Sequence, residues 1–423
     1  MKFLSTFCLI FGLGSAKAEL FTGTKASLPS TFEIKVQSEV KVRLEKAMKR
    51  ISVEGMGLRV SGLRTNPRVK NPEITRVDLT KDRKGAFSVN AFNGLELVQS
   101  FSVNEKSLII IRGDELKIEN KKVPGFLIVQ EHSIKESIQS KSAKLLDVIG
   151  VVPLETYIVG VLAKEIPLSW PLEAMKAQAV AVRSYTLAVM EERRKSSFHL
   201  ESTVDDQVFS YISKSRMPRS EYKNVILAVT QTEKLVLKDA KNRNIKAFYH
   251  SHCGGQTENP KDVWGGDKLL GHVKDPYCVA GKDSNWTYFV SRAELEKRIS
   301  QQFNFPRLAS LASSSSKNSR LYFVDLRSQD GFKKQIRADE LRQVLGYDKL
   351  KSAKFSARST DDGYEFKGSG LGHGVGLCQW GSKVQASQGK KYREILQFYY
   401  PTSRVSQNET HSSAQRFTKL RSL

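Results

Sequence analysis

Apolar and polar residues alternate with a period of two through the first third of the chain. The alternation is clearest in FEIKVQSEVKV (32–42), SLIIIRG (107–113) and FLIVQ (126–130). Such alternation puts one set of side chains on each face of an extended strand, so it predicts strands with one buried face. We therefore expect a β-rich region over residues 19–144.

A helical period replaces the alternation near residue 150. Apolar residues recur at helical spacing over 154–162 and again over 172–189, where Pro171 occupies a first-turn position that tolerates its missing N–H. Residues 235–250 predict two strands around a turn, and residues 291–305 predict a helix. Together these patterns predict an α+β fold, in which the β-rich region leads into a mixed α/β core.

The first eighteen residues have the parts of an export signal. Lys2 supplies the positive charge, residues 3–13 are apolar, and Ala16-Lys17-Ala18 fits a cleavage site of the A-x-A type. An uncleaved membrane anchor is the alternative. Export predicts a location in the periplasm, in the cell wall or outside the cell. No later run of 18 apolar residues predicts a membrane span.

The chain is strongly basic, with 68 Lys and Arg against 44 Asp and Glu. Loss of residues 1–18 would remove two lysines and no acid, so the formal charge of +24 would become +22. This balance favours a polyanionic partner, and for an exported protein we expect cell-wall polymers or anionic membrane surfaces. The chain shows no nucleic-acid motif. The alternative is that the charge serves solubility alone.

Glu165 is an acidic residue in an apolar setting. It follows GVLAK and precedes IPLSW in the stretch 160–185. Apolar surroundings raise the pKa of a carboxyl group, which suits it to act as a general acid. A solvated glutamate at a helix end is the alternative reading.

Three cysteines remain after the predicted signal. His250 and Cys253, with the more distant Cys278, supply zinc-type ligands for a structural site, and His252 or water could complete a tetrahedron. A Cys253–Cys278 disulfide is the rival in an exported protein, and free thiols are the third option. A zinc-dependent hydrolase using His250 and Cys253 is one functional reading of this set.

Three long segments, taken in order, resemble the SpoIID/LytB family of cell-wall proteins. They are GVLAKEIPLSWPLEAMKAQAVAVRSY (160–185), YHSHCGGQTENPKDVWGG (249–266) and GSGLGHGVGLCQWGSKVQASQGKKYREILQFYYP (368–401). LRQVLGYDKLKSAKF (341–355) is a weaker match. The resemblance implies a SpoIID/LytB-like catalytic core over 145–402. The polar and basic composition of residues 403–423 predicts a disordered tail.

The resemblance implies that Glu165 is the catalytic acid of a lytic transglycosylase that cleaves peptidoglycan glycan strands. Gln178, Arg183 and Tyr185 match further family positions and are candidates for substrate binding. Arg183 has a structural ion pair as its alternative role, Gln178 a buried polar contact, and Tyr185 a place in the cleft wall or the core. Some family members carry a pattern like that of the His250–Cys253 segment and bind zinc, which favours zinc here.

The glycine-rich stretch GHGVGLCQWG, 372–381, carries two more candidates. Its four glycines permit tight turns and close approach to a ligand, and the absence of a Lys-Ser/Thr signature excludes a phosphate loop. His373 and Gln379 are expected to line the glycan cleft, with a fold-determined loop as the alternative. Cys378 stands where the family often has a small hydroxyl residue, so we expect a small buried side chain without a metal role.

The resemblance leaves two function classes open. The first is an exported lytic transglycosylase with peptidoglycan as its partner. The second is a non-enzymatic cell-wall binding protein that enhances a partner amidase. The chemistry differs, because a transglycosylase needs a carboxyl proton donor at Glu165 and a binding protein does not.

Overall fold

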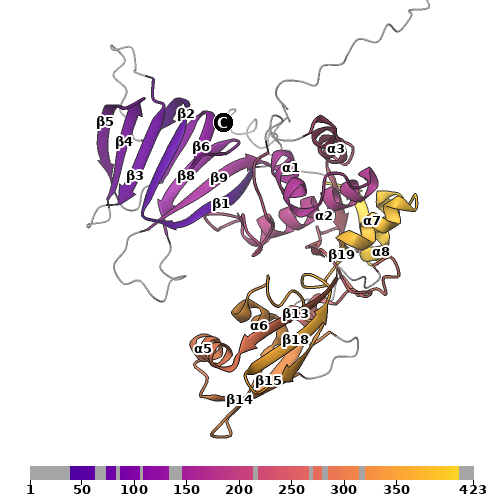
Figure 1. Ribbon diagram of the computed structural model, residues 1–423. Coiled ribbons are helices and arrows are strands. Elements are labelled where there is room, and N and C mark those ends of the chain that lie inside the picture. Colours follow the sequence, from indigo (N-terminus) through magenta and orange to yellow (C-terminus); the bar gives the residue numbers. More distant parts are fainter. Residues whose placement is uncertain are drawn as a thin grey trace, which may run out of the picture. The chain divides into compact units, whose positions relative to one another are not determined.

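The computed structural model describes most of the chain beyond residue 38 (Figure 1). The described ranges are 39–61, 73–81, 86–104, 108–132, 145–212, 218–265, 270–278, 284–313 and 320–408. All of them belong to one unit, Val36–Leu423. The predicted signal peptide, 1–18, and residues 409–423 of the predicted tail lie outside the described residues.

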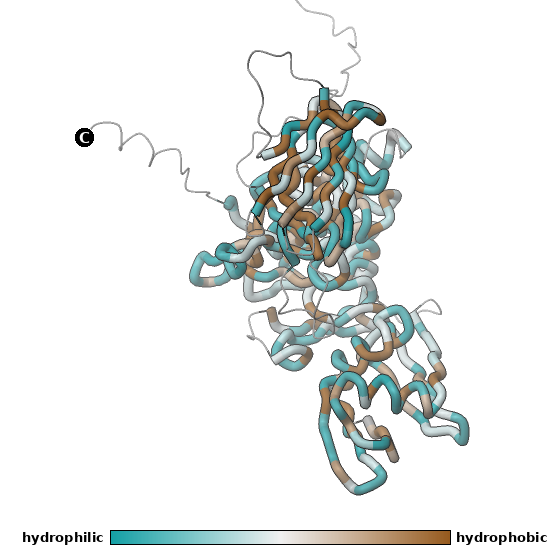
Figure 2. The backbone as a smooth tube through the Cα atoms, turned by 90° about the vertical axis from the view of Figure 1, so that its left-hand side faces the viewer, coloured by the Kyte–Doolittle hydropathy of each residue, from teal (hydrophilic) through white to brown (hydrophobic). Residues whose placement is uncertain are grey.

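The alternating segments of the first third form a large, mostly antiparallel sheet, with strand order β10-β1-β9-β8-β6-β2-β3-β4-β5 and with β7 beside β6. Hydrophobic and hydrophilic residues alternate along these strands (Figure 2), and one face buries a core that includes Val53, Leu79 and Ile111. The strands of this region are β1 (Glu39–Met48), β2 (Arg50–Val60), β3 (Arg76–Lys81), β4 (Phe87–Asn93), β5 (Glu96–Val103), β6 (Ile109–Ile118), β7 (Lys121–Lys122) and β8 (Phe126–Glu131).

The sheet continues into the part of the chain that the motifs assign to the core. Strand β9 (Leu146–Pro153) lies between β1 and β8 and pairs antiparallel with both. Strand β10 (Leu200–Glu201) adds to β1 in parallel. Residues 146–152 of β9 are all buried, as expected for a strand covered on both faces. The predicted boundary at residues 144/145 therefore falls just before a strand that completes the first region's sheet.

Three helices follow the sheet and form the centre of the core: α1 (Leu154–Glu165), α2 (Leu172–Glu192) and α3 (Arg219–Thr230). The apolar spacing predicted both α1 and α2. Pro153 and Pro171 precede them directly, in the extended conformation that residues before a helix adopt. Helix α2 is buried on two sides. Met175, Val182 and Val189 belong to the hydrophobic cluster that includes α1, whereas Ala177 and Ala181 belong to another cluster, which includes Leu237 and Leu377.

Short strands and helices cover the other side of α2. Strand β11 (Leu235–Lys238) pairs with β20 (Arg404–Gln407), and β12 (Tyr249–His250) pairs in parallel with β19 (Leu377–Cys378). The nearby helices are α4 (Pro260–Trp264), α7 (Gln379–Ser387) and α8 (Tyr392–Tyr399).

Strand β20 corrects the expectation of a disordered tail from residue 403. Residues 404–407 pair antiparallel with the four residues of β11. Arg404 also donates hydrogen bonds to the Asp239 carbonyl and the Asn242 side chain. The polar, basic composition of 403–423 concealed this strand, because edge strands tolerate exposed polar side chains.

Residues 285–369 carry a hydrophobic cluster of their own, between Cys278 and the glycine-rich stretch. Two three-stranded sheets, β13-β18-β17 and β14-β15-β16, pack with two helices. The elements are β13 (Asn285–Ser291), α5 (Arg292–Phe303), β14 (Leu308–Ser313), β15 (Phe323–Ser328), β16 (Lys333–Arg337), α6 (Ala338–Leu345), β17 (Phe355–Ser359) and β18 (Gly363–Ser369). The predicted helix at 291–305 is α5, and the fold as a whole is α+β as predicted. Among the described residues, none of the helices is long and apolar enough to cross a bilayer.

Candidate active site

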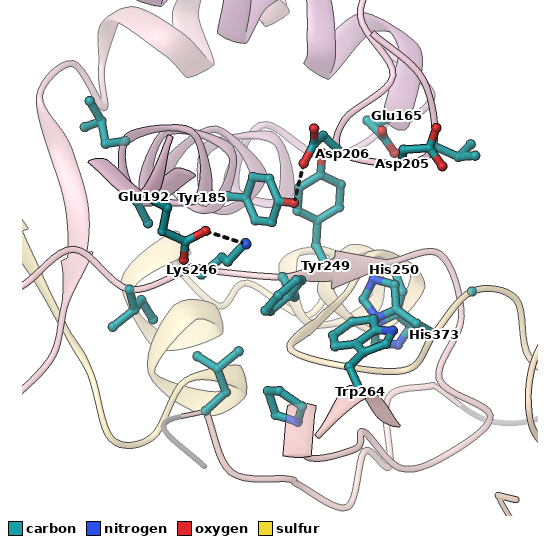
Figure 3. Close-up of a pocket in the computed structure, with 18 of the residues that line it drawn as sticks. Glu165, Tyr185, Glu192, Asp205, Asp206, Lys246, Tyr249, His250, Trp264 and His373 are labelled. Atoms are coloured by element: carbon teal, nitrogen blue, oxygen red, sulfur yellow. Dashed lines mark hydrogen bonds and ion pairs between the residues drawn. The ribbon is translucent and has the colours of Figure 1, made fainter. Parts of the chain in front are cut away.

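A large pocket, with a volume of about 1760 Å³, brings together residues from all three family motifs (Figure 3). Glu165 and Tyr185 come from the first motif, Tyr249 and Trp264 from the second, and His373 from the third. Arg342, Tyr347 and Lys351, from the weaker fourth match, line it as well. Segments far apart in the sequence thus meet at one cavity large enough for an extended ligand.

Glu165 is the last residue of α1, where the helix gives way to the extended residue Ile166. This position places the carboxyl at the negative end of the helix dipole, which disfavours its ionised form. Its Oε1 accepts a hydrogen bond of 3.1 Å from the Val208 N–H. The side chain is therefore anchored, and it remains at the pocket surface.

Burial raises the pKa of Glu165 above its ordinary value. The Val208 N–H, Gln379 and Tyr249 act against this, because each directs a polar group at the carboxyl and lowers its pKa. Burial prevails, so the group keeps its proton to a higher pH than a solvated glutamate would. The expectation that an apolar setting would raise the pKa of Glu165 agrees with this geometry.

Tyr185 lines the pocket. This is one of the two places that the sequence suggested for it, the other being the hydrophobic core. Its hydroxyl donates to Asp206 Oδ1 at 3.2 Å, and Arg193 holds the Asp206 carboxylate through bonds of 2.7 and 3.1 Å. Burial and the neighbouring Asp206 raise the pKa of Tyr185. The hydroxyl therefore stays protonated and acts as a fixed donor to Asp206.

His250 and His373 both line the pocket, and the backbone of Val375 holds both rings. The Nδ1 of His250 lies 3.0 Å from the Val375 carbonyl, and the Nδ1 of His373 accepts from the Val375 N–H at 3.0 Å. Burial lowers the pKa of His250 to about 3 and also lowers that of His373. Both imidazoles are therefore neutral near neutral pH.

Gln379 begins α7 and is buried beside Glu165, but it is not among the residues that line the pocket, where it was predicted to lie. Gln178 is buried within α2, and it is not part of the pocket lining either. Both polar atoms of the Gln178 amide lack a hydrogen-bond partner.

Arg183 was a candidate for substrate binding, and the structure assigns it the alternative role. Its guanidinium is 1% exposed and binds both carboxylate oxygens of Glu155, with Nε at 2.8 Å from Oε1. A third bond reaches the Leu235 carbonyl. Arg183 thus joins α2 to α1 and β11 inside the core, away from the residues that line the pocket.

The cysteines form a cluster that differs from the predicted ligand set. Side-chain atoms of Cys253, Asp275, Cys278 and Cys378 all lie within 4.8 Å of one another, and all four residues are buried. His250 is not a member of this group, and its Nδ1 lies 3.0 Å from the Val375 carbonyl. Cys378, which was expected to have no metal role, lies within this cluster.

Glycine explains how Cys378 reaches the cluster. Gly376 has φ +70°, and a Cβ there would lie 2.0 Å from the Phe248 carbonyl oxygen. This close approach lets β19 run beside β12, which sets Cys378 opposite His250 and next to the Cys253 backbone. Parallel pairing between distant segments is a property of the fold, so sequence spacing could not indicate it.

The cluster has the donors of a metal site. The thiols of Cys253 and Cys378 interact with Cys278 and lower its pKa, so one sulfur is readily ionised. Backbone N–H groups of Cys253 and Gly381 point at the Cys378 sulfur, at 3.3 and 3.4 Å. Three sulfurs and one carboxylate suit a tetrahedral ion such as zinc. All three cysteines are free, so the structure does not contain the Cys253–Cys278 disulfide.

Sequence reasoning missed several residues around Glu165. Tyr249 lies in the second motif, next to a histidine that attracted attention as a metal ligand, and Gln207 lies in a segment with no recognised motif. A buried carboxyl implies nearby polar partners, but only the fold shows which residues they are. The available signal for Tyr249 was its place as the first residue of the second motif.

Comparisons with known proteins agree with the motif analysis. The family described as Stage II sporulation protein, SpoIID, matches residues 142–238, which include Glu165. A protein of Brachyspira hyodysenteriae is 32% identical over 60% of this chain and 66% of its own length. The Stage II sporulation protein D of Bacillus subtilis is 27% identical over 60% of this chain and 75% of its own. The amidase enhancer of Bacillus subtilis is 28% identical over 57% of this chain and 39% of its own.

The chain belongs to the SpoIID/LytB family. The matched region spans about two thirds of the Brachyspira relative and well under half of the amidase enhancer. Family membership therefore rests on the core that carries the pocket.

Proposed function

We propose that this protein is an exported peptidoglycan lytic transglycosylase that uses Glu165 as general acid and then as general base. A cell-wall-related role fits the family and the relatives named for sporulation and for amidase enhancement. The single observation that carries the enzymatic proposal is the placement of Glu165. Its carboxyl is largely buried, has a raised pKa, and lines a pocket large enough for several sugars.

The first half of the reaction needs a proton for the leaving oxygen. A protonated Glu165 gives its proton to the glycosidic oxygen while the bond from that oxygen to the anomeric carbon breaks. The sugar then carries oxocarbenium-like positive charge. The raised pKa favours this step because it keeps the carboxyl protonated near the pH at which it must act.

The second half needs a base for the attacking hydroxyl. The 6-hydroxyl of the same sugar attacks the anomeric carbon, and its proton returns to the Glu165 carboxylate. The product is a 1,6-anhydro ring, and the enzyme recovers its starting protonation state. One carboxyl is enough for both halves, because the nucleophile belongs to the substrate.

The Cys253–Asp275–Cys278–Cys378 cluster would hold a structural zinc ion in this proposal. The three cysteines are buried and do not line the pocket, so a zinc-dependent hydrolase is a poor fit to this chain. A bound ion would tie the second motif to the third and so hold Tyr249 and Gln379 around Glu165.

The alternative is a cell-wall binding protein that enhances a partner amidase, which the name of one relative suggests. Under this reading the pocket would bind glycan without cutting it. Export through the N-terminal segment is part of both readings, and so is attraction to anionic cell wall by the formal charge of +22 that remains after loss of residues 1–18.

Product analysis on purified glycan strands separates the classes. We expect new chain ends that carry a 1,6-anhydro sugar. Free reducing ends would indicate hydrolysis and contradict the transglycosylase. Intact strands, together with faster cleavage by an added amidase, would support the enhancer instead.

A further inference from the structure

A set of buried polar groups connects Glu165 to the interior of the core. Gln207 lies at the centre of this set, 1% exposed, between α1 and α2. Its Oε1 accepts from the Tyr157 hydroxyl at 3.1 Å and lies 2.9 Å from the Thr186 hydroxyl. These two contacts hold one end of the Gln207 amide, and its Nε2 points the other way.

Burial raises the pKa of Tyr249, and the Nε2 of Gln207, which lies beside the Tyr249 hydroxyl, acts against this rise. A tyrosine oxygen that accepts from an amide N–H has its own proton left to donate. The neighbouring acceptor is Glu165, because the Tyr249 hydroxyl lies beside that carboxyl and acts to lower its pKa. In Figure 3 the Tyr249 ring extends from its strand toward the side of the pocket that holds Glu165 and Asp206.

Burial leaves these groups few alternatives. The Tyr249 oxygen, Gln207 Nε2 and Gln379 Nε2 are all buried and none has a hydrogen bond of full geometry. Unpaired buried donors cost free energy, so they mark a place where another state of the protein uses them. Catalytic hydrogen bonds are often long before substrate binds and shorten when it does.

We propose that Tyr249, oriented by Gln207, is a positioning residue that directs its hydroxyl proton at Glu165 and stabilises the carboxylate formed between the two halves of the reaction. The catalytic part of this statement rests on the proposed function, whereas the direction of the hydrogen bonds does not. The Val208 N–H donates to Glu165 at 3.1 Å, and Gln379 lies beside the same carboxyl as a further donor.

The titratable groups that face this site come from three segments. Tyr157 lies on α1, Tyr185 on α2, and Asp206 on the loop between β10 and α3, and all three interact electrostatically with Tyr157 or Tyr249. Burial raises the pKa of Tyr157, Tyr185 and Tyr249, so these hydroxyls keep their protons over the working range. Over that range Glu165 is the group of this set whose charge changes during the proposed reaction.

Three variants test the proposal. Tyr249→Phe removes only the hydroxyl, and Gln207→Met keeps side-chain length but removes the amide. Tyr364→Phe is the control, because its hydroxyl is equally buried and lacks a hydrogen-bond partner but lies outside the pocket lining. For Tyr249→Phe we expect kcat to fall about 10-fold or more with KM nearly unchanged, from loss of one hydrogen bond to a charged group.

A titration that needs no activity separates this proposal from the proposed function. The carboxyl carbon of Glu165 is followed by NMR after ¹³C-glutamate labelling, with Glu165→Gln used to assign the signal. Loss of a donor to the carboxylate raises its pKa, so we expect a higher Glu165 pKa in both Tyr249→Phe and Gln207→Met, and no change in Tyr364→Phe. A higher pKa in a protein that does not cut glycan would retain the positioning role and discard the transglycosylase.

Two results would overturn the proposal. An unchanged Glu165 pKa in a folded Tyr249→Phe variant would show that the hydroxyl does not reach the carboxyl. A raised pKa in Tyr249→Phe with an unchanged or lowered one in Gln207→Met would show the opposite direction of bonding, in which Tyr249 donates to Gln207. If Tyr249→Phe does not fold, the Gln207→Met titration alone decides between the two directions.

Discussion

Arg183 and Glu155 form a buried ion pair in which both carboxylate oxygens are bound by one guanidinium. The side chains are 1% and 9% exposed, so neither partner has water as a substitute. The pair connects the first two helices of the core, one of which ends in Glu165.

Arg183→Ala is predicted to destabilise the protein by about 3–5 kcal/mol, because it leaves the Glu155 carboxylate buried without its partner. Urea or thermal unfolding measures the change. Arg358→Ala is the control, since the Arg358–Glu365 pair is mostly exposed on the arginine side, and its loss should cost under about 1 kcal/mol. Equal, small effects of both variants would contradict the structural role of Arg183.

The cysteine cluster predicts a pattern of metal content across variants. We expect the purified protein to carry about one zinc ion per chain, as a four-ligand site does. Cys253→Ser and Cys378→Ser should each lower both metal content and melting temperature, while His250→Gln should leave metal content unchanged. Elemental analysis of the three variants gives the answer. Zinc lost from His250→Gln and kept by Cys378→Ser would restore the ligand set expected from sequence.

The raised pKa of Glu165 predicts a pH profile for glycan cleavage. The carboxyl must be protonated to act as an acid, so the rate should be high at low pH and fall as pH rises through the Glu165 pKa, with a midpoint above the ordinary value of 4.5. Initial rates across pH measure this midpoint. A midpoint at or below 4.5 would contradict the role of burial.

The same pKa has a consequence for stability. A carboxyl whose pKa is higher in the folded than in the unfolded state binds more protons when folded, so its contribution is present at low pH. The contribution is lost as pH rises from 4.5 through the raised folded value. The unfolding free energy of the wild type should therefore fall over this window relative to that of Glu165→Gln. Parallel stability curves for the two proteins would show that the Glu165 pKa is not raised.

Positive charge predicts salt-sensitive attachment to cell wall. Binding to sacculi should weaken steeply between 0.1 and 1 M salt, because the Debye length shrinks from about 10 Å to about 3 Å. Turnover of short, neutral glycan fragments should change little. Salt-independent binding to sacculi would show that the positive charge does not attach the protein to the wall.

The pairing of β20 with β11 predicts different effects of two truncations. Truncation after residue 408 should preserve the fold, whereas truncation after residue 402 removes β20 and should destabilise the protein.

Local periodicity predicted the elements that depend on local residues. The helices α1 and α2 and the strands of the first region follow from the spacing of apolar side chains. Contacts between distant segments did not follow. Cys378 and Cys253 are 125 residues apart and meet because β12 and β19 pair in parallel, and Arg183 turns inward because Glu155 lies opposite it. Residue types suggested metal and substrate ligands, but only the fold assigns each to a cluster, a core or a pocket.

Cleavage of purified glycan strands by Glu165→Gln tests the central claim most directly. Glutamine keeps the size and polarity of the side chain but has no acidic proton to give. The account predicts that the wild type produces 1,6-anhydro ends, and that a folded Glu165→Gln variant produces them at least about 100-fold more slowly, in line with the usual weight of general acid catalysis. Near-normal formation of anhydro ends by that variant would contradict the assignment of Glu165.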